Sequence, residues 1–116
     1  MAEGKIDWAG VCFIAVASHD APLFKAPGLY GFARREWNAE RTLLYIGQAE
    51  VIAVDAAPGA QRWTQALGLG MNELHVCLCQ GERIDRLQLQ ARIVRRLEPI
   101  LNLIDRDMPP LIKASA

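Results

Sequence analysis

Short runs of alternating hydrophobic and polar residues, separated by turn-forming residues, predict several strands along this chain. An apolar run predicts a buried strand over Val11–Ala17. Residues 28–36 and 42–47 predict two further strands, and turn chemistry at Asn38 joins them as a hairpin. Residues 72–80 alternate and predict a strand with both faces at least partly covered.

Two later segments have the spacing of helices. Residues 60–70 place Trp63 on an apolar helical face and end at glycines. Residues 82–98 form the clearest helix, with its apolar stripe at Ile84, Leu87, Ala91 and Val94. Residues 49–57 fit a strand or a helix equally well. This order of elements predicts an α+β fold, in which helices flank a small antiparallel β-sheet.

Composition favours one folded domain over residues 1–116, because 52% of the residues are hydrophobic and 22% are charged. We expect a core at 27–102, a strand and loop at 5–26 before it, and a tail at 103–116. Thirteen basic residues balance thirteen acidic ones, so any nucleic-acid binding would come from local patches.

Cysteine content and the N-terminal apolar run both favour a cytoplasmic protein. The run at 8–18 is far shorter than a membrane span, and it predicts a buried strand rather than a signal peptide. Three cysteines, an odd number, favour a reducing compartment. His75, Cys77 and Cys79 lie on one straight predicted strand and cannot converge on a tetrahedral metal, so we expect buried thiols there.

Three short motifs occur in a fixed order on the predicted hairpin and the late helix. They are G-L-Y at 28–30, Y-I-G at 45–47, and a helical segment from Gln90 to Asn102 that contains a proline. Together they resemble the GIY-YIG nuclease superfamily, in which two such strands form a hairpin and a late helix runs into a proline and an asparagine. The resemblance covers residues 27–102.

Members of this family use two tyrosines to position or deprotonate the attacking water, a helix arginine to stabilise the phosphate, and a glutamate to hold one divalent metal. The resemblance gives the tyrosine roles to Tyr30 and Tyr45, with Gly47 letting the backbone turn near the site. The glutamate aligns with Gln90 and the arginine with Asp55, so both charged groups are replaced. This implies a degenerate member that has lost hydrolysis.

We therefore expect a non-catalytic module without a cofactor that binds nucleic acid or protein. Weak, salt-dependent contact with DNA or RNA is expected from five arginines that otherwise form a solvated surface: Arg34, Arg35, Arg62, Arg92 and Arg96. The alternative is an active endonuclease whose Mg²⁺ or Mn²⁺ is held by Glu50. Asn102 belongs either to the remnant site or to a turn after Pro99, and Trp37 is expected to be exposed.

Overall fold

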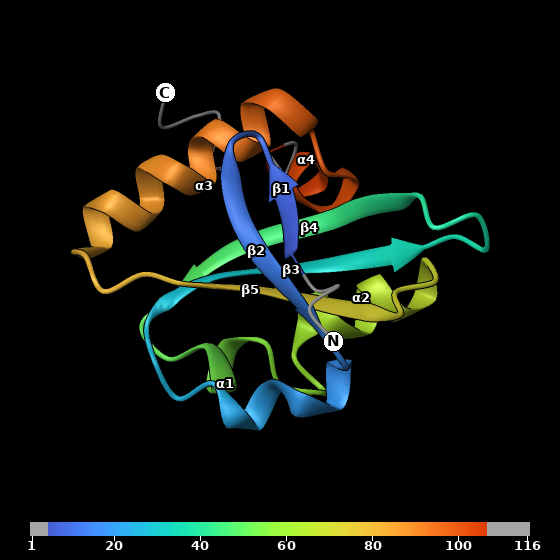
Figure 1. Cartoon of the computed structure of the whole chain (residues 1–116), viewed down its shortest axis with the longest axis horizontal. Coiled ribbons are helices and arrows are strands. Elements are labelled where there is room, and N and C mark those ends of the chain that lie inside the picture. The colour runs from blue at the N-terminus through green and yellow to red at the C-terminus, as the bar shows by residue number, and fades with distance from the viewer. Residues whose placement is uncertain (1–4, 107–116) are drawn as a thin grey trace.

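A computed structural model of the chain describes residues 5–106 and contains one antiparallel sheet of five strands (Figure 1). The strands lie in the order β1-β2-β5-β3-β4. Their bounds are Lys5–Trp8 for β1, Val11–Val16 for β2, Gly28–Arg35 for β3, Arg41–Ala49 for β4 and Glu73–Leu78 for β5. The predicted α+β class is confirmed.

In the part of the chain that the structure describes, four α-helices and one 3₁₀ helix pack around this sheet. Their bounds are Ser18–Leu23 for the 3₁₀ helix η2, Ile52–Asp55 for α1, Gln61–Gly68 for α2, Arg83–Leu97 for α3 and Ile100–Arg106 for α4. Helix α4 takes in the start of the predicted tail, whereas residues 107–116 lie outside the described residues. Within residues 5–106, no helix combines the length and the apolar content needed to cross a bilayer.

The sheet consists of two hairpins with β5 inserted between them. Val76 in the middle of β5 pairs with Ile14 of β2 on one side and with Tyr30 of β3 on the other. The predicted hairpin of β3 and β4 is confirmed. Strand β1 was not predicted, because it has only four residues and ends at Trp8, where the apolar run begins. Ala9 and Gly10, both with positive φ, make the turn into β2.

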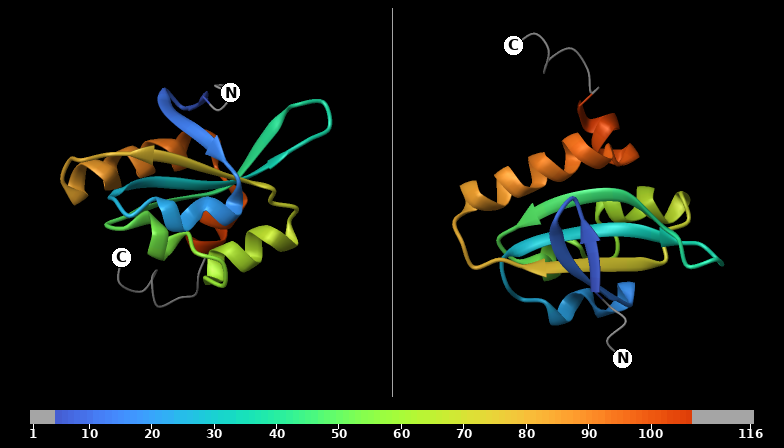
Figure 2. Two further views of the ribbon diagram at one scale, coloured as in Figure 1. Left: turned by 60° about the horizontal axis from the view of Figure 1, so that its bottom comes forward. Right: turned by 45° about the horizontal axis from the view of Figure 1, so that its top comes forward.

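Each face of the sheet carries its own hydrophobic cluster. One cluster contains Tyr30, Phe32 and Leu44 and is closed by residues of α1, α2 and α4. The other contains Leu29 and Ile46 and is closed by residues of α3 and of the β1–β2 hairpin. In both views of Figure 2, α3 lies on the opposite side of the sheet from η2 and α1.

The structure corrects two sequence predictions about packing and secondary structure. Most of the predicted apolar stripe of α3 is not its buried face: Ile84 is 56% exposed and only Val94 packs against the core, whereas Arg86 and Ile93 are buried. The helix packs by the side that follows Arg86 and Ile93, and hydrophobic spacing alone does not reveal which side meets the sheet. The predicted loop after β2 contains the 3₁₀ helix η2, which is too short to show a periodic pattern.

Candidate functional site

The two motif tyrosines lie on adjacent strands and face the same side of the sheet. Their ring centroids are 6.1 Å apart, and Phe32 packs against both rings. Tyr30 and Phe32 share a face because they are two residues apart on β3. A register shift after Phe32 places Tyr45 directly opposite Phe32. The two tyrosines to which the resemblance assigns paired roles therefore lie together on one face of the sheet.

Gly47 pairs with Tyr30 across the hairpin, and the tyrosine ring lies directly over it. A Cβ atom at this position would sit 2.7 Å from both Cζ and Oη of Tyr30. Glycine is therefore needed for close approach, as is common for glycine within strands. It does not make the predicted turn, because β4 continues through Gly47 to Ala49.

A cation and an anion from the next two helices approach the tyrosine pair. The guanidinium carbon of Arg62, on α2, lies 5.8 Å from the centroid of the Tyr45 ring. Asp55 ends α1, close enough for its charge to act on Tyr30. The predicted exchange of arginine for aspartate at position 55 thus leaves an arginine beside the site after all, because α2 brings Arg62 back to it.

Burial raises the pKa of the Tyr30 phenol far above its ordinary range. The neighbouring Tyr45 and Asp55 raise this pKa further, and the positive charge of Arg62 only partly opposes them. Tyr30 therefore stays protonated at neutral pH. Its hydroxyl can take part in a hydrogen bond, but it cannot act as a phenolate base.

Gln90 and Asn102 reach β4 at its outer edge, where both side chains bond the backbone of Ile46. Asn102 Oδ1 accepts from the Ile46 N–H at 2.8 Å, and its Nδ2 donates to the Ile46 carbonyl at 2.9 Å. Gln90 Nε2 donates to the same carbonyl at 3.2 Å. These amides satisfy an edge strand that would otherwise expose unpaired backbone groups. Asn102 is therefore more than a local turn residue.

Glu50, the alternative metal ligand, is paired with a buried arginine. Its Oε2 lies 2.7 Å from Nη2 of Arg86, whose side chain is 2% exposed. Arg86 also donates to the side chain of Gln48 and to the Gly81 carbonyl. Arg86 is not among the residues predicted from the sequence to form a site. Its spacing of four and seven residues from Gln90 and Ile93 placed it on their side of the helix.

The other predicted arginines lie at two further places. Arg34 bonds Glu36 and the Leu69 carbonyl, and Arg35 lies beside it near the end of the hairpin. Arg92 and Arg96 belong to α3. The structure therefore does not gather the five arginines into one patch. Trp37 is 96% exposed in the hairpin turn, as predicted.

His75 is the centre of a buried polar chain rather than a metal ligand. Its Nδ1 accepts from Trp8 Nε1 at 2.9 Å, and its Nε2 lies 2.9 Å from Glu73, which also pairs with Arg41. The thiols of Cys77 and Cys79 are half-buried rather than buried as predicted, and Cys79 lies just after the end of β5. Burial raises the pKa of the Cys77 thiol. No cluster of three or more histidine, cysteine or acidic side chains within residues 5–106 could hold a metal ion.

No protein-family model, no curated protein and no solved structure matches this chain. Its function is therefore inferred from the geometry of the site itself.

Proposed function

We propose that this chain is a degenerate GIY-YIG nuclease-like domain that binds nucleic acid without cleaving it. The observation that carries the proposal is the packed pair of Tyr30 and Tyr45, with Gly47 beneath Tyr30 and Arg62 beside Tyr45. A tyrosine pair on one face of such a hairpin is what the resemblance implies. A protein ligand at the same surface is the alternative outcome of the experiments below.

The chemistry of the site favours binding over hydrolysis. A nuclease of this kind needs an anionic ligand for a hard divalent cation, whereas Gln90 is neutral and its amide is bonded to β4. Asp55 adds negative charge near Tyr30, where a phosphate would need positive charge. Tyr30 itself remains protonated, which removes a possible base.

The same groups suit contact with a nucleic acid. Tyr45 is partly exposed, and its ring together with the Arg62 guanidinium combines an aromatic surface with a positive charge. Since the net charge of the chain is zero, this contact would be local and steeply salt-dependent.

The ion pair of Glu50 with Arg86 disfavours the alternative of an active nuclease in which Glu50 holds the metal. Moving the Glu50 carboxylate onto a metal would leave the buried guanidinium of Arg86 without its ionic partner. Removing one partner of such a pair is costly, because a buried charge remains uncompensated.

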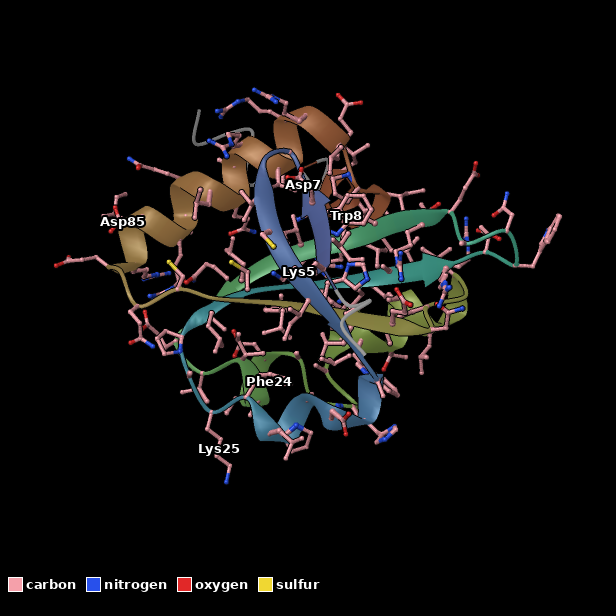
Figure 3. All side chains as sticks on the ribbon, in the orientation of Figure 1. Lys5, Asp7, Trp8, Phe24, Lys25 and Asp85 are labelled. Carbon is pink, nitrogen blue, oxygen red and sulfur yellow. The ribbon has the colours of Figure 1, made fainter. Side chains whose placement is uncertain are left out.

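Fluorescence anisotropy with labelled single-stranded and duplex DNA and RNA tests binding. At low salt we expect weak, sequence-tolerant binding that Arg62→Ala reduces severalfold. Lys25→Ala is the matched control: it also removes one positive charge, but from an exposed side chain that points away from the molecule (Figure 3). Arg92→Ala with Arg96→Ala measures the separate contribution of α3. No binding at low salt would favour a protein ligand.

A cleavage assay tests the loss of chemistry. With Mg²⁺ or Mn²⁺, the protein should leave plasmid and single-stranded substrates uncut. Gln90→Glu alone should restore metal affinity but little cleavage, and adding Asp55→Arg gives the double variant its best chance of activity. Metal-dependent nicking by the unmodified protein, abolished by Tyr45→Phe, would overturn the proposal and make Glu50→Gln the next variant to test.

A further inference from the structure

Helix α3 carries an apolar stripe along a flank that its packing against the sheet leaves largely open. The residues of this α3 stripe are Ile84, Leu87, Ala91 and Val94. Ile84 is 56% exposed, Leu87 is 37% exposed and Ala91 is also exposed, whereas Val94 is half-buried against the cluster that contains Ile93. A surface helix normally presents polar residues to water, so the stripe needs another explanation.

The spacing of the stripe is that of a helix that packs against another helix. Steps of three, four and three residues repeat the a and d positions of a heptad, at which side chains of one helix fit between those of its partner. A hollow of about 390 Å³ lies along the stripe, lined by Leu87, Gln90, Ala91, Val94 and Arg95. It offers space for apolar side chains from a facing helix.

Charges beside the stripe point to the partner and its direction. Asp85 lies in the first turn of α3, at the outer end of the helix in Figure 3, and Arg92 and Arg95 follow in later turns. All three border one groove on the same flank of the stripe. Two antiparallel copies of α3 would set Asp85 of each helix beside Arg92 and Arg95 of the other, whereas parallel copies would set like charges together.

We propose that the α3 stripe binds the same stripe of a second copy of this chain, with the two helices antiparallel about a two-fold axis. Such an interface is self-complementary, as most homodimer interfaces are. The proposal does not depend on the tyrosine pair, which packs in the hydrophobic cluster on the opposite face of the sheet. Gln90, which the resemblance assigns to the remnant site, also lines the hollow beside the stripe.

Sedimentation velocity over a wide concentration range tests this dimer. The unmodified protein should form dimers as its concentration rises. Leu87→Glu places a charge in each half of the interface and should raise the concentration of half-dissociation by about tenfold or more. Leu23→Glu is the matched control, because Leu23 is 74% exposed on η2, on the other side of the sheet, and its substitution should leave the dimer unchanged.

A charge exchange tests the direction of the helices. Asp85→Arg and Arg95→Asp should each weaken the dimer, and the double variant should regain it. The two positions are ten residues apart, about 15 Å along one helix, so they cannot pair within a single α3. Circular dichroism checks that each variant keeps its helix, because Asp85 also caps the first turn.

Each contrary result is decisive. A protein that stays monomeric at every concentration would overturn the proposal. This includes the case in which another segment of the same chain covers the stripe. A dimer that Leu87→Glu leaves intact would also overturn it. A dimer that Leu87→Glu breaks but the charge exchange does not restore would rule out the antiparallel arrangement.

Discussion

Two asparagines in this molecule make the same pair of backbone hydrogen bonds in opposite surroundings. Asn102 brackets the N–H and carbonyl of Ile46 in the buried middle of β4. Asn72 brackets the N–H and carbonyl of Arg35 at the exposed end of β3, where its side chain extends the ladder ahead of β5. Water can replace the side chain of Asn72 but cannot reach the backbone of Ile46. Losing the two bonds of Asn102 should therefore lower the free energy of unfolding more than losing the two bonds of Asn72.

Two residues that the resemblance assigns to the remnant site have a structural role at the edge of β4. Asn102 and Gln90 stand at positions that the resemblance assigns to the remnant site, yet both amides close the edge of a nine-residue strand. The opposite edge strand, β1, has four residues and alternates exposed with half-buried side chains. A long edge strand needs other groups to bond or shield its unpaired backbone N–H and carbonyl groups, whereas a short edge strand can leave them exposed to water. A residue at a position that the resemblance assigns to a site can thus have a purely structural role.

Asn102→Ala should separate the two asparagines most clearly. It leaves the buried N–H of Ile46 unpaired, so we expect unfolding free energy to fall by roughly 2–4 kcal/mol. Asn72→Ala, its matched control, should cost roughly 0.5 kcal/mol, because water replaces the lost bonds. Urea denaturation measures both. Equal losses would show that burial does not distinguish the two contacts.

Gly47→Ala tests the close packing of the Tyr30 ring against the backbone of β4. The added methyl group would collide with the ring of Tyr30, so we expect a loss of roughly 1–3 kcal/mol in unfolding free energy. Gly68→Ala is the control: it has no neighbour within 4 Å and lies on a helix, so it should be neutral or slightly stabilising. A tolerated Gly47→Ala would contradict the close approach of Tyr30.

Acid should weaken the buried polar chain of His75. Burial lowers the pKa of His75, so the folded protein keeps it neutral, while the unfolded chain binds a proton below about pH 6.5. Stability should therefore be full above that pH and decline as pH falls. Burial alone would raise the pKa of Glu73, but hydrogen bonds from Arg41 and His75 together lower it, which extends the decline below about pH 4.3.

Thermal melting between pH 7.5 and 5.5 measures this decline. His75→Gln should flatten the dependence, because the titrating group is gone. His19→Gln is the matched control, since the His19 side chain is 83% exposed and its removal should keep the slope. An unchanged slope in His75→Gln would assign the acid sensitivity to other groups.

Trp37→Ala should have the smallest effect on stability. Trp37 is 96% exposed at the end of the hairpin, so we expect unfolding free energy to change by less than about 0.5 kcal/mol. Urea denaturation beside Asn102→Ala provides the contrast. A loss comparable to that of Asn102→Ala would mean that the hairpin end is more ordered than its exposure indicates.

The sequence predicts elements well where the pattern is local. The hairpin of β3 and β4 follows from alternation around a turn, and the predicted helix at 82–98 matches α3 to within one residue at each end. The buried side of α3 could not be predicted, because both sides carry apolar residues at helical spacing. Which of them meets the sheet depends on tertiary contacts.

The candidate site shows the same limit. The resemblance gave paired roles to Tyr30 and Tyr45, and the hairpin brings their rings together, since strand pairing within a hairpin is short-range. The hydrogen-bond partner of Asn102 is the backbone of Ile46, fifty-six residues earlier in the chain. A local sequence pattern cannot predict so distant a contact. The return of Arg62 to Tyr45 depends on the path between α1 and α2, where Gly59 has a positive φ.

The insertion of β5 between the two hairpins has a consequence for folding during synthesis. Both hairpins leave the ribosome before residues 73–78, which form β5. Until then, β2 and β3 lack the strand that pairs with both of them. Sheet formation must then close long loops, which slows folding and leaves strand edges open meanwhile. Pulse-labelling hydrogen exchange should show amides of the β3–β4 hairpin protected before those of the β2–β5 pair. A nascent chain stalled before residue 73 would hold two separate hairpins, each able to pair with the wrong neighbour.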